Sequence, residues 1–186
     1  LYNEIECPAV AVTNAFNTVL YTGNGSTQSI TSLDFQPDLV WIKARVTAYS
    51  NRLFDSVRSL NGRIESNTTA AEVSNTVNDN FVSFDSNGFT LGATSSTNGS
   101  NFNGEPFVSW NWKAGGTAVS NTDGTITSQV SANVDAGFSI VKYTGSSPNQ
   151  TVGHGLDATP EFIVVKNLDT AGNGWATQSP FSGGAD

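Results

Sequence analysis

A near-repeat within the chain is the feature that most limits its fold. Residues 16–23 read FNTVLYTG and residues 138–145 read FSIVKYTG. After a one-residue insertion the match resumes, with LDFQPDLVWIK at 33–43 and LDATPEFIVVK at 156–166. Nine identities over these 19 positions exceed the roughly one or two expected by chance from average composition. Because the spacing of about 120 residues is too long for a solenoid repeat of about 20–50 residues, we infer a duplicated domain.

The repeat predicts how the chain is divided. We expect an N-terminal extension at 1–13, a first module at 14–115, a connector at 116–132, and the first half of a second, homologous module at 133–186. The chain contains no methionine, not even at position 1. We therefore expect a processed or shortened chain. Because the second copy stops before any counterpart of residues 65–112, we expect the chain to continue beyond residue 186, and a degenerate second module is the alternative.

Small polar residues between short apolar runs favour an all-β fold. Ser, Thr, Asn and Gly supply 81 of the 186 residues, which is turn chemistry. FVSFDSNGFTLG at 81–92 predicts a hairpin whose Asn-Gly tolerates positive φ angles. One stretch, Thr68 to Val77, is predicted as helical. We expect antiparallel β-sandwich modules in tandem, of jelly-roll or concanavalin-like type, with the second module incomplete.

Charge and composition exclude several classes of function. The net charge is −8, whereas sequence-independent binding to phosphates needs a basic surface, so we expect no nucleic-acid partner. No apolar run approaches the roughly 18 residues of a membrane span, so we expect no membrane insertion. The single cysteine, Cys7, excludes an internal disulfide and a cysteine-based zinc cluster.

Several segments together resemble a known family. VLYTGNGSTQSI (19–30), FQPDLVWIK (35–43), LFDSVRSLNG (53–62), FDSNGFTLG (84–92) and WNWKAGG (110–116) resemble the tandem modules of large structural, tail-fibre-like proteins of marine bacteriophages, of the cyanophage and pelagiphage type. The resemblance covers nearly the whole chain from about residue 14. It implies concanavalin-like or SPRY-like sandwich modules and a location in the virion, and the shortened second copy departs from it.

The sequence does not indicate a catalytic triad or a clear pair of catalytic carboxylates. His154 is the only histidine, and its position in the first copy holds none, so we interpret it as a turn residue rather than a triad member. Paired carboxylates could hydrolyse glycans, but the acids are scattered and several lie in turn contexts. They are Asp34, Asp38, Asp55, Glu65, Glu72, Asp79, Asp85 and Glu105. We expect no catalytic, cofactor-binding or metal-binding residues and no enzymatic activity.

Two stretches and the tryptophans remain as binding candidates. DSNG (85–88) and NTDG (121–124) superficially resemble the start of a calcium loop, and we expect Asx turns there instead, with calcium as the alternative. Trp41, Trp110, Trp112 and Trp175 could stack on sugars, but Trp41 matches Val164 in the second copy, and Trp110 and Trp112 share a strand face with Val108. We expect Trp41 to serve packing and Trp110 and Trp112 to lie in the core, and we place any binding surface on the polar loops 24–32, 59–69 and 93–104.

Charged side chains near strand ends are predicted to hold the scaffold together. We expect Lys43, Lys166, Arg45, Arg52 and Arg58 to cap strands or form ion pairs, with Arg58 bridging to Asp55 or a loop carbonyl in a surface pair.

The favoured hypothesis is a non-enzymatic virion structural protein, a tail-fibre or appendage component that assembles with copies of itself and other virion proteins. It would contact a host surface glycan or protein, with repetition giving avidity. A capsid decoration or cement protein is the first alternative, and a large apolar face would indicate it. A bacterial surface filament or adhesin is the second, and a glycan depolymerase is disfavoured.

Overall fold

The computed structural model describes residues 14–60, 62–74, 81–94, 99–146 and 148–179, so the extension expected at 1–13 lies outside the described residues. Within these ranges the chain forms strands and loops and no helix. The strands are β1 (Phe16–Thr22), β2 (Gln28–Ile30), β3 (Leu39–Ala44), β4 (Arg52–Asp55), β5 (Gly62–Arg63), β6 (Val73–Ser74), β7 (Phe81–Asp85), β8 (Gly88–Leu91), β9 (Pro106–Trp112), β10 (Val119–Asn121), β11 (Ser128–Asn133), β12 (Phe138–Tyr143), β13 (Ile163–Lys166) and β14 (Trp175–Gln178).

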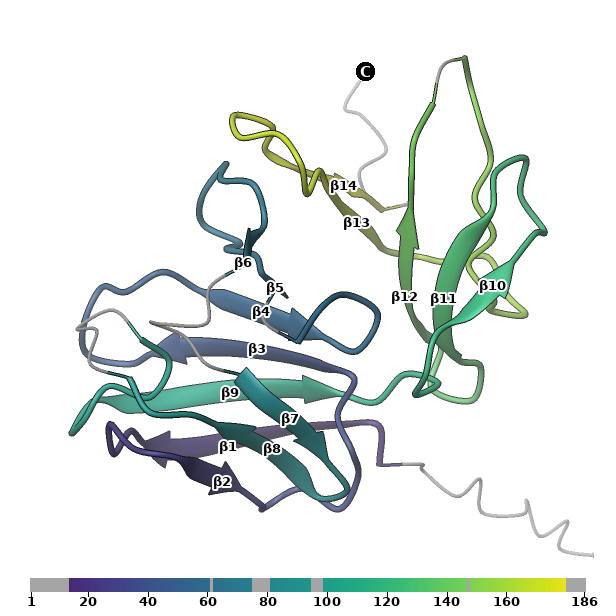
Figure 1. The fold of residues 1–186 in the computed structure, drawn as a ribbon. Coiled ribbons are helices and arrows are strands. Elements are labelled where there is room, and N and C mark those ends of the chain that lie inside the picture. Colours follow the sequence, from purple (N-terminus) through teal and green to yellow (C-terminus); the bar gives the residue numbers. More distant parts are fainter. Residues whose placement is uncertain (1–13, 61, 75–80, 95–98, 147, 180–186) are drawn as a thin grey trace, which may run out of the picture.

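Two antiparallel sheets pack face to face in the first module. One has the order β1-β9-β3-β4 and the other the order β2-β8-β7, and Figure 1 shows the second lying in front of the first. Apolar side chains at alternate positions of each strand point between the sheets, as in a sandwich. The all-β, antiparallel sandwich class predicted from the sequence is confirmed.

Phenylalanines from both sheets form the centre of the core. The ring of Phe81 stacks on Phe54 at 4.7 Å and on Phe89 at 5.7 Å between centroids. Val40 and Phe89 have no exposed surface. The buried cluster is made of Val19, Ile30, Leu33, Phe35, Val40, Ile42, Ala44, Phe54, Phe81, Phe89, Leu91 and Phe107. All of these residues belong to the first module.

The hairpin predicted at 81–92 is confirmed as β7–β8, with Asp85 opposite Gly88. No described residue other than glycine has a positive φ, so the turn residues Ser86 and Asn87 do not adopt the left-handed conformation. Gly88 is needed for a different reason. A Cβ atom there would lie 1.7 Å from the carbonyl oxygen of Ile30, so only glycine lets β2 end against this turn.

The helix predicted from Thr68 to Val77 is wrong within the described part of that stretch. Residues 68–72 are irregular and β6 follows at Val73–Ser74, while residues 75–77 lie outside the described residues. Thr, Ser, Asn and Val are weak helix formers, and tertiary contacts hold the segment instead. The amide of Glu72 donates to the carbonyl of Leu168 at 2.7 Å.

The rest of the chain forms smaller sheets. β10, β11 and β12 make one three-stranded sheet, and β13 and β14 make a separate hairpin, both beside the first module in Figure 1. The segment expected as a connector, 116–132, contributes β10 and most of β11 to this sheet. At the junction Asp38 Oδ2 accepts from the amides of Ala114 at 2.8 Å and Gly116 at 3.2 Å.

Candidate functional site

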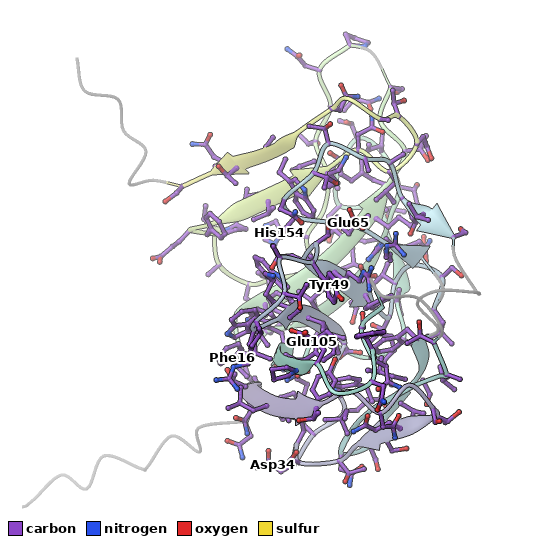
Figure 2. The ribbon with its side chains drawn as sticks, turned by 90° about the vertical axis from the view of Figure 1, so that its left-hand side faces the viewer. Phe16, Asp34, Tyr49, Glu65, Glu105 and His154 are labelled. Carbon is purple, nitrogen blue, oxygen red and sulfur yellow. The ribbon has the colours of Figure 1, made fainter. Side chains whose placement is uncertain are left out.

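The outer side of the β1-β9-β3-β4 sheet is an apolar surface of the first module. We call it the outer aromatic face, and it consists of Phe16, Leu20, Trp41, Val108, Trp110 and Trp112. The strand register aligns these side chains across the sheet, because Trp110 lies opposite both Thr18 and Trp41, and Trp112 lies opposite Phe16. Phe16 is 50% exposed and Leu20 is 61% exposed. Figure 2 shows Phe16 at the left-hand edge of the first module.

The expectation that Trp110 and Trp112 lie in the core is wrong. The face of β9 that points between the sheets carries Phe107, Ser109 and Asn111, and Val108, Trp110 and Trp112 are only half-buried on the other face. Phenylalanines of the neighbouring strands fill most of the space between the sheets, which leaves room for small side chains at positions 109 and 111. Asn111 Nδ2 donates to Asn17 O at 3.0 Å and to Ser109 Oγ at 3.1 Å, which offsets the cost of burying its NH₂ group.

Aromatic contacts order the outer face. Trp41 meets Trp110 edge to face at 5.8 Å, and Phe16 lies 4.9 Å from Trp112 between ring centroids. On the other side Phe138 of the second module stacks on Trp112 at 6.2 Å. Exposed indole and phenyl rings can stack on the apolar faces of sugar rings or pack against an apolar protein surface. The outer aromatic face is therefore suited to such a contact.

The ammonium group of Lys43 lies near the end of β3. It is bonded to backbone carbonyls, so it is not a free charge on the outer aromatic face. Its Nζ donates to Thr47 O at 3.5 Å and to Tyr49 O at 2.8 Å. Lys166 repeats the arrangement in the second module, donating to Asn167 O and to Asn173 O, each at 2.9 Å. The predicted strand-capping role of this lysine pair is confirmed.

Two of the three loops proposed as binding surfaces come together through one buried side chain. Asn101, 2% exposed, accepts from the amide of Asn24 at 3.0 Å and donates to Gly92 O at 3.1 Å. Thr94 N donates to Gly25 O at 3.2 Å. We call residues 23–27 and 99–104 the Asn101 loop pair. It presents a polar surface on a fixed backbone, and the sequence did not indicate that these loops are neighbours.

The third loop, 59–69, lies apart from the Asn101 loop pair and is held by a buried arginine. Arg58 Nε contacts Asp55 Oδ2 at 2.5 Å, and its Nη1 contacts Glu72 Oε1 at 2.7 Å. Nη1 also donates to Gly62 O at 3.1 Å. The predicted bridge from Arg58 to Asp55 and a loop carbonyl is confirmed, but the pair is not on the surface, since the Arg58 side chain is only 4% exposed.

Glu105 anchors the loop that follows β3. Its carboxylate accepts from Thr47 Oγ1 at 2.6 Å, from Thr47 N at 3.0 Å and from Val46 N at 3.2 Å. The Thr47 hydroxyl, followed by the Thr47 and Val46 amides and the charge of Lys43, holds the pKa of Glu105 below its ordinary value, although burial opposes the shift. Tyr49 and Glu105 are both labelled on the first module in Figure 2.

His154, predicted as a turn residue, lies in an irregular loop between the bridge at Val152 and the bend at 157–158. Its Nδ1 accepts from the amide of Leu156 at 3.1 Å, and its carbonyl accepts from Ser139 Oγ at 2.6 Å. A shallow surface pocket here is also lined by Asp123 and Asp157. No described serine donates its hydroxyl to a ring nitrogen of His154, so the described residues do not assemble a serine–histidine pair.

The acids identified in the sequence mostly bond to side chains or amides near them. Asp85 accepts from Ser83 Oγ and Thr90 Oγ1, each at 2.7 Å. Glu65 pairs with Arg63 at 3.2 Å, and Asp34 accepts from Asn14. Asp79 lies outside the described residues. Within the described ranges no three His, Cys, Asp or Glu side chains gather as a metal site would require.

At the second candidate calcium stretch, the amide of Asp123 donates to Asn121 Oδ1 at 3.0 Å. This bond is the predicted Asx turn.

The fourth tryptophan forms a hydrogen bond to the first module. Trp175 Nε1 donates to Glu65 O at 3.0 Å, so this indole fixes β14 against the 59–69 loop.

In the part of the chain that is described, no helix has the length and apolar character needed to cross a membrane.

One comparison with known proteins gives a match. A family model described as domain of unknown function DUF7483 matches residues 11–180, which include the first module and most of the second. No curated protein and no solved structure matches the chain.

Proposed function

We propose that this chain, which belongs to the DUF7483 family, is a non-enzymatic virion structural protein of a bacteriophage, a tail-fibre or appendage component that takes part in host attachment. The observation that carries the proposal is a duplicated scaffold that presents polar loops. Both copies keep the strand-capping lysine, as Lys43 and Lys166, while the residues between the conserved motifs differ. Repeated modules give reach, and several weak contacts add up to avidity.

In this proposal the Asn101 loop pair contacts the host surface. Asn24, Ser26 and Asn103 are exposed there, and their amide and hydroxyl groups suit hydrogen bonding to a glycan or a polar protein surface. The buried Asn101 fixes both loops before binding, so little conformational entropy would be lost on contact.

The outer aromatic face favours a second candidate, a capsid decoration or cement protein. Leu20 is 61% exposed and Phe16 is 50% exposed on a face with three half-buried tryptophans. Exposed apolar patches of this kind mark protein–protein contacts. A contact between modules of an appendage would use the same face, so the two candidates differ in what covers it.

The test combines location with two surface variants. Gold-labelled antibody against the chain should mark appendages of phage particles that encode it, and pre-incubating host cells with purified protein should slow phage adsorption. Asn103→Arg in the Asn101 loop pair should weaken that competition about tenfold or more, whereas Leu20→Lys on the outer aromatic face should leave it unchanged.

Other outcomes contradict the proposal. Label on the head, together with loss of capsid binding in Leu20→Lys only, would favour the decoration protein. Label inside the particle would contradict both candidates. Release of sugar from host polysaccharide by the purified protein would overturn the non-enzymatic assignment.

A further inference from the structure

We propose that the second module has an open strand position between β12 and β13, and that a strand with the chemistry of β9 fills it, supplied by the same polypeptide after β14. The inference goes beyond the virion role and does not depend on it. It rests on comparing the two copies of the duplicated scaffold strand by strand.

In the first module β9 is the strand that joins β1 to β3. It pairs antiparallel with both, so that Ser109 lies opposite Val19 on one side and opposite Ile42 on the other. Lys113 N donates to Ala15 O at 2.8 Å and Gly23 N donates to Glu105 O at 2.9 Å, which extends the pairing beyond both ends of β1. Without β9 the sheet would divide into β1 alone and the pair β3–β4.

The second module has this divided form. By the sequence repeat β12 corresponds to β1 and β13 corresponds to β3. β12 pairs with β11 and β13 pairs with β14, and among the described residues no strand joins β12 to β13. Since a strand has two edges, each of these two keeps one edge without a described partner. Unpaired edges are templates for an added strand.

Side-chain burial shows that the second module is incomplete around β13. Ile163 is 42% exposed, whereas its counterpart Val40 is fully buried, and Val165 is 38% exposed, whereas its counterpart Ile42 is 2% exposed. Phe162, which precedes β13, is 64% exposed. In the first module Val40 and Ile42 pack in one cluster with side chains of the β2-β8-β7 sheet, so the exposure of their counterparts indicates an incomplete module rather than a strand designed for solvent.

The register of β9 predicts the chemistry of the inserted strand. In the first module Val108 lies opposite Leu20 and Lys43. Their counterparts in the second module are Lys142 and Lys166, so one residue of the inserted strand would lie between two lysines. Because opposite charges on facing strand positions are stabilising and like charges are destabilising, we expect an acidic residue to be favoured there.

The pairing of β9 and the order of the strands along the chain favour the same polypeptide over a second copy. The β9 strand of another copy is already paired on both edges within its own module, so donating it would break that module. In the first module β9 follows β4 along the chain, and β14 corresponds to β4. The same order places the inserted strand after β14.

A synthetic peptide with the sequence of residues 105–113, EPFVSWNWK, tests the open position on the 186-residue chain. We expect one peptide to bind per chain, with slower amide exchange in β12 and β13 measured by hydrogen-exchange mass spectrometry. A peptide carrying Val108→Glu should bind about five-fold more tightly than one carrying Val108→Lys. A peptide carrying Ser109→Pro should not bind, because proline removes a ladder donor.

Variants of the chain test where the peptide binds. Val165→Asp should abolish peptide binding, whereas Val46→Asp, at a 78% exposed position of the first module, should not affect it. Absence of binding by EPFVSWNWK, or protection confined to β1 and β3, would overturn the proposal. A chain that sediments as a dimer and releases monomer when the peptide binds would show that a second copy fills the position, which would overturn the assignment to the same polypeptide.

Discussion

Single buried polar side chains decide how the loops of the first module are fixed. Asn101, Asp38 and Glu105 each bond to backbone amides that no strand pairs, and each is at least nine-tenths buried. An amide shielded from water without a partner is costly, so these residues act as local substitutes for strand pairing. Their positions in the sequence look like ordinary polar loop residues, and only the folded structure distinguishes them.

The contribution of Glu105 to the stability of the fold should depend on pH. Its folded-state pKa is below the ordinary value, so the folded state binds fewer protons than the unfolded state and stability rises with pH in this range. We expect the stability that Glu105 contributes to be complete above its ordinary pKa and to be lost as the pH falls through the lowered one. The measurement is the midpoint of urea unfolding between about pH 3 and 6, a range set by the ordinary Glu pKa.

The variant Glu105→Gln should show a smaller decrease of this midpoint at acid pH than the unchanged chain. Asp135→Asn removes the same charge at an exposed position and serves as the control. Equal pH profiles for Glu105→Gln and the unchanged chain would contradict the role given to the Thr47 and Val46 contacts.

At the scale of elements, the same sequence pattern gives different burial in the two copies. β3 and β13 end in matching lysines that cap the strand in the same way. Yet Val40 of β3 is fully buried, and its counterpart Ile163 is 42% exposed. The pattern predicts a strand in both places, but the neighbours of that strand determine what its side chains contribute to stability.

Truncating one isoleucine in each of these two strands measures this difference. Ile42→Ala should lower the free energy of unfolding by about 2–5 kcal/mol, because it leaves a cavity in a closed core. Ile163→Ala should lower it by less than about 1 kcal/mol, because much of that side chain is already in water. Both values come from urea unfolding followed by tryptophan fluorescence. Similar losses for the two variants would mean that β13 is covered in solution.

At the scale of the whole molecule, the buried apolar cluster belongs to the first module alone. The rest of the chain contacts the first module through Phe138 on Trp112, through Gly115 N to Ser131 Oγ at 3.0 Å and through Trp175 Nε1 to Glu65 O at 3.0 Å, and none of these residues belongs to the cluster. The first module should therefore be a folding unit, and the second should depend on further strands.

We expect a fragment of residues 14–115 to fold by itself and to unfold in one cooperative transition. Its circular dichroism should show strand structure, and its urea midpoint should lie close to that of the cooperative transition of the whole chain. A fragment of residues 116–186 is the matched comparison and should show no cooperative transition. An unfolded 14–115 fragment would show that the junction at Phe138 is essential to the first module.

The sequence by itself determined the features that depend on neighbours along the chain. It predicted the all-β class, the β7–β8 hairpin, the Asx turn at Asn121 and the paired lysine caps, because turn geometry and strand alternation are local. Only the tertiary structure decided which face of β9 is buried, how Asn101 joins two loops, and that Val73–Ser74 is a strand and not part of a helix. Both faces of β9 carry apolar residues, so alternation alone leaves two choices. The phenylalanines of β7 and β8 cover one face, and contacts between residues far apart in the chain make that choice.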